Sequence, residues 1–310
     1  MNKLLKNPIL YLAVFTLFIT ACQSNLDKSG VNENITTETE ETTPDPEEEE
    51  IKATVEKLLF AAGNYNIEAL DDMVSDKAML GISILKDGNW SNSESTIDEY
   101  FENVKNRKLI PYCEIPNNYD IIITEGRIAL VRADGILYRY GVPLNREINH
   151  FTMMKENGEW KFLNISFTVE RIPEEKKKFD LDIFARSYAQ AWGSKRPNFV
   201  ASYFAKDGAI QVNDGEPAIG RTAITKVVQG FMTDLPDMIV RYDSLVPKSK
   251  GTEFHWTLMA TNTGSGGTGN KVKVSGYEFW QLDDNGLIMN SQGHFPTEEY
   301  NRQIEFGIEN

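Results

Sequence analysis

The sequence contains very little cysteine and histidine for its length, which limits the chemistry that it can support. Its 310 residues include two cysteines, Cys22 and Cys113, and three histidines. His150, His255 and His294 lie far apart, without the close ligand spacing that marks zinc sites in sequences. We therefore expect no metal site and no cofactor.

Basic residues are scarce as well. The chain has 32 lysines and arginines against 46 acidic residues, a formal net charge of −14. Proteins that bind nucleic acids concentrate lysine and arginine on one face, and no basic patch or run in this sequence argues for such binding. We therefore expect no nucleic acid partner.

Familiar catalytic motifs are also missing. The sequence has neither the G-x-S-x-G string of a nucleophile elbow nor a Walker sequence. Residues 264–269 match G-x-G-x-x-G, but a dinucleotide site needs a helix next, with its N-terminus facing the pyrophosphate. Residues 271–282 have the pattern of a strand, so we interpret 264–269 as a hairpin loop.

Residues 1–21 have the pattern of a signal peptide. Lys3 and Lys6 form a basic start, an apolar run covers residues 9–19, and small residues precede Cys22. The apolar run is too short to span a membrane. The alternative is an ordinary secretory peptide in which Cys22 is incidental.

The string Ile19-Thr20-Ala21-Cys22 resembles the lipobox of bacterial lipoproteins. The resemblance implies cleavage before Cys22, lipidation of that residue, and a protein held on a membrane of the bacterial cell envelope. A lipidated Cys22 leaves no pair for an intrachain disulfide, although the compartment would permit one. We expect Cys113 to be a small buried hydrophobe.

Residues 22–50 look like an acidic tether. They contain ten acidic residues against one lysine and almost no apolar side chain. Such a segment cannot offset the entropy of ordering, so we expect it to be disordered. Its charge would be repelled by anionic lipid and would hold the rest of the chain away from the membrane.

The remaining chain shows one order of elements twice, which predicts two domains at residues 51–172 and 180–310. A short charged segment, 173–178, separates them. Apolar periodicity predicts three helices and then a run of strands in each half. In the first half the helices are expected near 51–62, 66–74 and 97–104, and strands at 78–85, 119–124, 128–140, 147–155 and 160–169. In the second half the helices are expected from 181, 197 and 221, and strands at 209–212, 239–246, 253–262, 271–282 and 287–295.

The strand at 271–282 has an unusual face. Alternation places Glu278 on the same side as Trp280 and Leu282. A carboxylate among apolar neighbours costs free energy unless it is paired, hydrated or protonated. This pattern suits one wall of a partly polar pocket, and it also suits an edge strand with a satisfied glutamate.

Helices followed by a meandering sheet predict an α+β fold, with three helices packed on a strongly curved antiparallel sheet in each domain. A sheet that bends over a helix makes a cone, and the interior of such a cone is a usual site for small ligands.

Several strings in the second half resemble the nuclear transport factor 2-like superfamily, in particular its SnoaL-like branch. They lie at residues 204–209, 231–238, 274–280, 285–288 and 293–295. The first half shares only the order of elements and the string at 157–162. The superfamily includes isomerases, cyclases, hydrolases and binding proteins without enzymatic activity, so the resemblance implies the fold and leaves the function open.

The ketosteroid isomerases of this superfamily imply roles for individual residues. Their two oxyanion donors correspond to Tyr188 and Glu278, and such an acid works while protonated in an apolar site. Their general base corresponds to Val212, which cannot take a proton. The aspartate that usually follows the last strand in the SnoaL-like branch is replaced by Pro296. The resemblance therefore implies a pocket without its proton-abstracting residues, and we name no catalytic residue.

We expect the second cone to bind a small organic ligand. The expected ligand-binding residues, which alternation and the resemblance place around Glu278, are Tyr188, Glu278, Trp280, Asn290, Gln292 and His294. Asp243, His255 and Trp256 are further candidates. Two alternatives stay open: a SnoaL-like enzyme with acid/base chemistry, and an interaction module that forms a homodimer through its sheets. The hairpin glycines of the two halves, Gly158 and Gly286, lie 128 residues apart. Subtracting 128 from Glu278 gives His150 as its counterpart in the first half.

Overall fold

The computed structural model describes residues 45–106 and 109–308, and its strands form two separate six-stranded sheets. The signal peptide, Cys22 and most of the expected tether lie outside the described residues. Each sheet has helices packed on one face, which confirms the predicted α+β fold with two cone-like domains.

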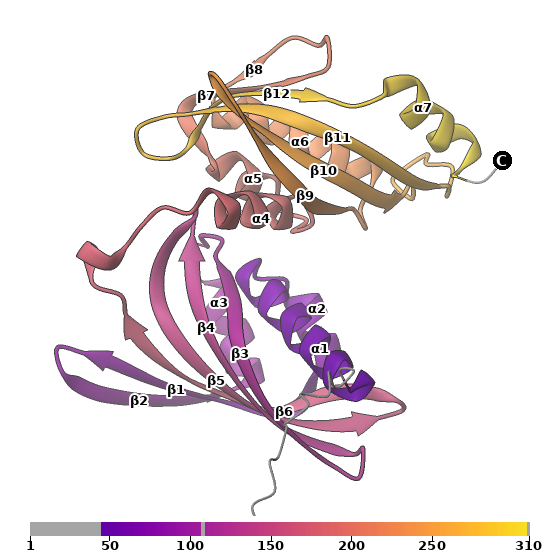
Figure 1. The fold of residues 1–310 in the computed structure, drawn as a ribbon. Helices are drawn as coiled ribbons and strands as arrows, with labels where there is room; N and C mark the ends of the chain where they lie inside the picture. The colour runs from indigo at the N-terminus through magenta and orange to yellow at the C-terminus, as the bar shows by residue number, and fades with distance from the viewer. Residues whose placement is uncertain (1–44, 107–108, 309–310) are drawn as a thin grey trace, which may run out of the picture. The chain divides into compact units, whose positions relative to one another are not determined.

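Among its described residues, the first domain contains three helices and six strands. Its helices are α1 (Pro46–Gly63), α2 (Ile67–Met73) and α3 (Ile97–Lys105). Its strands are β1 (Val74–Lys86), β2 (Asn89–Thr96), β3 (Cys113–Thr124), β4 (Ile128–Arg139), β5 (Val142–Glu156) and β6 (Glu159–Arg171). The strand order is β2-β1-β6-β5-β4-β3, and Figure 1 shows the helices against the concave side of the bent strands.

Helix α1 begins earlier than expected. The sequence predicts disorder up to residue 50, whereas the helix starts at Pro46. Asp45 caps it by accepting a hydrogen bond from the amide of Glu47 at 2.9 Å, and proline is well suited to the first helical position. The acidic run that suggested disorder lies in the first turn, where negative charge is favoured by the helix dipole.

The sheet of the first domain is mixed rather than purely antiparallel. Strands β1 and β6 run parallel, and every other pair in this sheet is antiparallel. After the β1–β2 hairpin, α3 carries the chain across the helical layer to the far edge, where β3 starts the meander. The meander returns to the middle of the sheet and places β6 beside β1 in the same direction.

Strand β2 was not predicted. Its sequence, Asn89–Thr96, is almost entirely polar and its residues are almost all exposed, so it shows no apolar alternation. Pairing with β1 holds it in place, from Met79 opposite Thr96 to Lys86 opposite Asn89.

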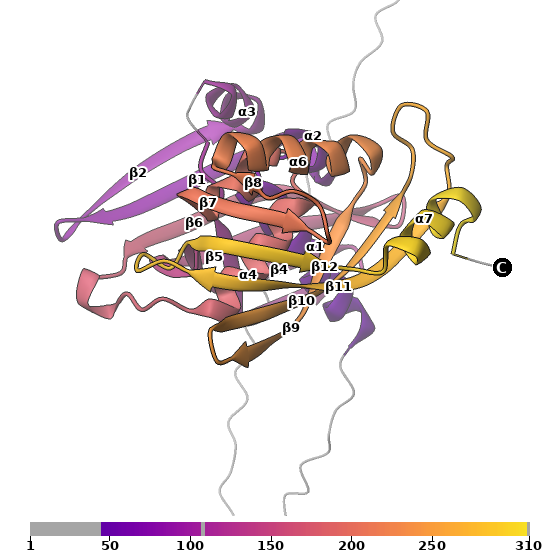
Figure 2. The same ribbon diagram turned by 90° about the horizontal axis from the view of Figure 1, so that it is seen from above.

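The second domain has four helices and six strands. A 3-10 turn at Glu174–Lys176 follows β6, and the helices are then α4 (Leu181–Trp192), α5 (Pro197–Ser202), α6 (Arg221–Asp234) and α7 (Thr297–Phe306). The strands are β7 (Phe204–Val212), β8 (Ala218–Ile219), β9 (Ile239–Lys248), β10 (Gly251–Thr261), β11 (Lys271–Leu282) and β12 (Ile288–His294). Figure 2 shows α6 next to β7 and β8, with α7 after the end of β12.

This sheet repeats the topology of the first. Its order is β8-β7-β12-β11-β10-β9, and β7 and β12 again form a parallel pair. The glycine-rich segment 264–269 joins β10 to β11, so a strand follows it, as the hairpin-loop interpretation requires.

Each domain has its own apolar core. The core of the second domain is rich in aromatic rings that the curved sheet encloses, and its largest fully buried side chains include Tyr188, Tyr203, Phe254 and Trp280. Cys113 is buried, as expected. Over residues 45–106 and 109–308, no helix combines the length and the apolar character that crossing a membrane requires.

Candidate functional site

Tyr188 and Glu278 meet inside the second domain. Tyr188 projects from α4 and is fully buried, and its hydroxyl lies 3.0 Å from Oε2 and 3.3 Å from Oε1 of Glu278 on β11. The tyrosine ring packs edge-on against Trp280 and Phe254, with centroids 5.1 and 5.5 Å away. The apolar stripe of α4 and the alternation of β11 place both side chains on the inner face, as the sequence predicts.

The carboxyl group of Glu278 accepts three hydrogen bonds. Besides Tyr188, the hydroxyl of Ser291 donates to Oε2 at 2.6 Å and the indole Nε1 of Trp280 donates to it at 3.0 Å. Burial raises the pKa of Glu278 above its usual range, and these three donors partly oppose the shift because they favour the ionised form. Desolvation is the larger effect, so the pKa of this carboxyl is higher in the folded protein than in the unfolded chain.

A small pocket opens beside this carboxyl. Its volume is about 60 Å³, enough for a few water molecules and well below the roughly 300–1,000 Å³ of typical ligand sites. Glu278 is the one ionisable side chain among the residues that the structure shows around it. The other lining residues are Trp192, Ile210, Gln211, Val212, Phe231, Val240, Trp256, Leu258, Gly293 and Phe295.

Trp256 supplies a further polar group in the pocket wall. Its indole Nε1–H is buried and has no hydrogen-bond partner within the described part of the chain. Gly276, its partner across the β10–β11 pair, makes room for the ring, because a Cβ there would come 2.7 Å from Cζ2 of Trp256. Leaving an indole N–H unpaired in an apolar wall costs about 1–3 kcal/mol, which a ligand with a hydrogen-bond acceptor would recover.

Three of the predicted ligand-binding residues point away from the pocket. Asn290, Gln292 and His294 are exposed on the outer face of the sheet, and His294 packs there against Tyr277. The prediction was wrong because β12 contains a bulge at Met289: Leu282 pairs with Ile288, but Gln281 pairs with Asn290. One extra residue reverses the alternation, so side chains expected inside lie outside.

The same bulge turns Ser291 inward, where sequence reasoning did not place it. Its hydroxyl makes the shortest of the contacts to Glu278. Tyr188 and Trp280 are buried around the carboxyl and are not part of the pocket wall, so their role is to hold Glu278 rather than to touch a ligand. No single-sequence signal indicates a bulge at Met289.

Of the further candidates, Trp256 alone lines the pocket. His255 contacts Glu253 at 3.1 Å and packs on Tyr277, and Asp243 accepts a hydrogen bond from Thr257 at 2.6 Å. Throughout the described ranges, no group of three or more histidine, cysteine, aspartate or glutamate side chains is arranged to hold a metal ion.

The family model of the SnoaL-like domain matches residues 185–290. No curated protein sequence matches the chain. A protein of ketosteroid isomerase-like fold from Catenulispora acidiphila is 17% identical and covers 38% of this chain and 88% of its own, with a TM-score of 0.34.

A second solved structure is similar to the same degree. A nuclear transport factor 2-like protein of unknown function from Burkholderia pseudomallei is 17% identical, covers 38% of this chain and 91% of its own, and gives a TM-score of 0.34. At 17% identity, these structures do not indicate a substrate for this chain. The chain thus has two sheet-based domains, and its residues 185–290 match the family model of the SnoaL-like domain.

Proposed function

We propose that the second domain binds a small organic molecule with a hydrogen-bond acceptor, such as a carbonyl oxygen, and does not abstract a proton from it. The observation that carries the proposal is the buried, unpaired Nε1–H of Trp256 in the same apolar wall as Glu278. Two polar groups in an apolar pocket are the usual arrangement of a small-molecule site.

Glu278 supplies the second polar contact. A protonated carboxyl can donate one hydrogen bond, and Oε2 already accepts the contacts from Ser291 and Trp280. Oε1 has one longer contact, with Tyr188, and is therefore the oxygen better able to carry the proton. A ligand carbonyl between Trp256 and Glu278 would accept two hydrogen bonds.

Val212 argues against isomerase chemistry. It lines the pocket at the position where the related isomerases carry their base, and an alkyl side chain cannot remove a proton. The pocket volume of about 60 Å³ further restricts the ligand to a few non-hydrogen atoms unless the partly buried rings of Trp256, Phe231 and Phe295 move outward.

Binding is testable with cyclopentanone as the probe and cyclopentane as its hydrocarbon counterpart. We expect the ketone to shift the indole ¹H–¹⁵N NMR signal of Trp256 saturably, and the hydrocarbon to bind more weakly. The Trp256→Phe variant removes one hydrogen bond, worth about 1 kcal/mol, and should bind the ketone about fivefold more weakly, as measured on the indole signal of Trp192, which also lines the pocket. Trp90→Phe, at an exposed position of the first domain, is the control and should bind normally. Unchanged affinity in Trp256→Phe would contradict the proposal.

We also propose that the chain is anchored to a membrane of the bacterial cell envelope through a lipid on Cys22. The support is the order of basic residues, apolar run and small residues before this cysteine. In Cys22→Ser we expect the protein to leave the membrane fraction or to remain as an uncleaved precursor. Cys113→Ala should stay with the membrane, because Cys113 is buried and distant in sequence. A mature chain that mass spectrometry finds unmodified and starting elsewhere would refute the anchor.

A further inference from the structure

The first domain encloses a larger cavity than the second. Its volume is about 260 Å³, close to the lower end of the range for small-molecule sites. Apolar side chains from α1, α2, α3 and the sheet form most of the wall, among them Leu58, Leu80, Ile97 and Phe151. Its polar residues are two glutamates, one asparagine and three tyrosines: Glu114, Glu147, Asn149, Tyr65, Tyr100 and Tyr112.

The two glutamates reach each other across an intervening strand. Glu114 lies on β3 and Glu147 on β5, and between them on β4 is Gly135, which pairs directly with Glu147. A Cβ on residue 135 would come 3.4 Å from Oε1 of Glu114 and 3.1 Å from the carbonyl oxygen of Ile115. The missing side chain lets the carboxyl of Glu114 lie over β4, where it hydrogen-bonds the carboxyl of Glu147.

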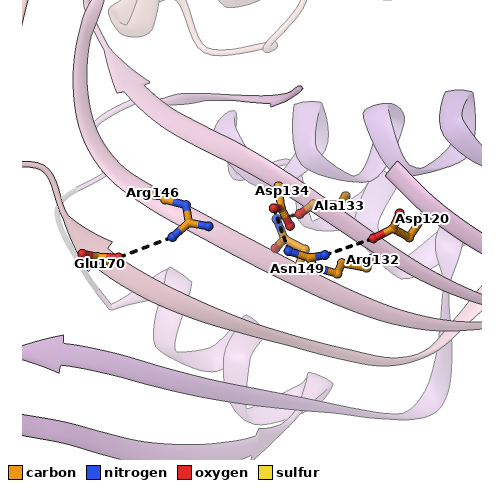
Figure 3. A network of polar contacts seen from close by, with 7 residues as sticks. All are labelled: Asp120, Arg132, Ala133, Asp134, Arg146, Asn149 and Glu170. Carbon is orange, nitrogen blue, oxygen red and sulfur yellow. Dashed lines mark hydrogen bonds and ion pairs between the residues drawn. The ribbon is translucent and has the colours of Figure 1, made fainter. Parts of the chain in front are cut away.

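Two asparagines fix the pair in position. The side-chain amide of Asn149 donates to Oε1 of Glu114 at 2.5 Å, and that of Asn145 donates to Oε1 of Glu147 at 3.3 Å. Asn149 is in turn near the carbonyl oxygen of Ala133 on β4, at 3.4 Å (Figure 3). The carboxyl groups are thus part of a built site with defined hydrogen bonds.

We expect the pair to share one proton and to carry one negative charge. Two carboxyls in hydrogen-bond contact share a proton, because both cannot ionise at close range. Burial first, and the charge of Glu114 second, raise the pKa of Glu147 to about 8, and burial also raises that of Glu114. Among the described residues, the other ionisable groups that line this cavity are the hydroxyls of Tyr65, Tyr100 and Tyr112, and burial raises the pKa of Tyr112 well above its usual range.

No cation of the described chain neutralises this charge. Ion pairs between described residues leave out both Glu114 and Glu147. Arg146 precedes Glu147 on β5 but points to the opposite face, where it pairs with Glu170 at 3.6 Å. Arg132 likewise binds Asp120 and Asp134, at 3.0 and 2.8 Å, as Figure 3 shows.

We propose that the cavity of the first domain binds a small organic ammonium ion. Its positive charge would be neutralised by the Glu114–Glu147 pair, and its alkyl groups would pack on the rings of Tyr65, Tyr100 and Tyr112. A buried negative charge needs a positive partner, and tyrosine rings attract a cation that lies over their faces. A calcium ion would need six to eight oxygen ligands, and the two carboxyls and one amide here supply fewer.

The test uses choline as the probe and 3,3-dimethyl-1-butanol, its uncharged isostere, in isothermal titration calorimetry. The two molecules have the same shape, so their difference reports the charge. We expect choline to bind the full chain at least about tenfold more tightly than the alcohol. Equal affinities would overturn the proposal, and this comparison needs no variant.

Glutamine substitutions sharpen the test because glutamine has the shape of a protonated glutamate. Glu147→Gln keeps one carboxylate beside one neutral amide, so it should bind choline within about threefold of the original chain. The double variant Glu114→Gln/Glu147→Gln has no charge and should lose at least about tenfold in choline affinity, while its affinity for the alcohol stays the same. Glu156→Gln, an exposed position on β5, is the control. Retained choline binding in a folded double variant, or displacement of choline by equimolar calcium, would overturn the proposal.

Discussion

Replacing Glu278 by leucine should destabilise the second domain by about 3 kcal/mol or more. Leucine leaves three buried donors without their acceptor: the hydroxyls of Tyr188 and Ser291 and the indole N–H of Trp280. Each buried donor that loses its partner costs about 1–3 kcal/mol, and Tyr188 and Trp280 are packed in the aromatic core outside the pocket wall. The gain from removing a desolvated acid offsets only part of this loss.

Glu278→Gln should be much milder, with a loss of about 1 kcal/mol or less. An amide oxygen at the position of Oε2 can still accept from the indole and from the hydroxyl of Ser291, and the hydroxyl of Tyr188 can accept from an amide nitrogen at the position of Oε1. Urea unfolding, followed by the fluorescence of the tryptophans of this domain, measures both variants. Gln281→Leu, three positions further along the same strand and outside the pocket wall, is a control that should cost little. Equal losses for the leucine and glutamine variants of Glu278 would show that the carboxyl does not organise these donors.

The meeting of Tyr188 and Glu278 was predicted from the resemblance to the ketosteroid isomerases, and two simple periodicities place both side chains on the inner face. Strand β11 has the predicted bounds, Lys271–Leu282, and its alternation is unbroken from Val274 to Trp280. Helix α4 buries the stripe that includes Tyr188. Where no insertion interrupts the period of two residues in a strand or of 3.6 residues in a helix, the sequence is sufficient to identify the inner face.

Bulges mark where the prediction failed. In β12 the bulge at Met289 exchanges the inner and outer faces, and a shift in the β3–β4 pairing between Pro116 and Asn118 does the same in β3. Glu114 and Asp120 are six positions apart and would share a face in an unbroken strand. Because of the second shift, Glu114 lines the cavity while Asp120 is exposed on the outer face. A bulge arises from packing against neighbouring strands, and its position is not encoded in a local apolar pattern.

The cavity of the first domain was missed for a related reason. A constant offset of 128 residues relates the hairpin glycines, Gly158 and Gly286, and it maps Glu278 to His150. His150 is exposed, while its neighbours Asn149 and Phe151 are buried. The hairpin between β5 and β6 is tighter than that between β11 and β12, so the offset is wrong within the strands. An error of one residue is enough to choose the wrong face.

The buried acid pair predicts an unusual dependence of stability on pH. Glu147 has a pKa of about 8 in the folded protein against an ordinary value of 4.5, so between these values the folded chain holds a proton that the unfolded chain has lost. The stabilisation is complete below about pH 4.5, declines as the pH rises, and is lost above about pH 8. Each unit of pKa difference corresponds to about 1.4 kcal/mol, so the first domain should lose a few kcal/mol over this range.

Glu147→Gln should remove most of this decline, because glutamine stays neutral at every pH and preserves the hydrogen bond to Glu114. We expect the variant and the original chain to have similar stability near pH 4.5, and the variant to be more stable by a few kcal/mol at pH 8.5. Urea titrations at both pH values, followed by the indole NMR signal of Trp160 in the core of the first domain, measure the difference. The control variant Glu156→Gln should have the same stability as the original chain at both pH values. If the two chains differ by the same amount at pH 4.5 and 8.5, Glu147 is not protonated in the folded state. The Glu114–Glu147 pair would then carry two negative charges at neutral pH instead of one.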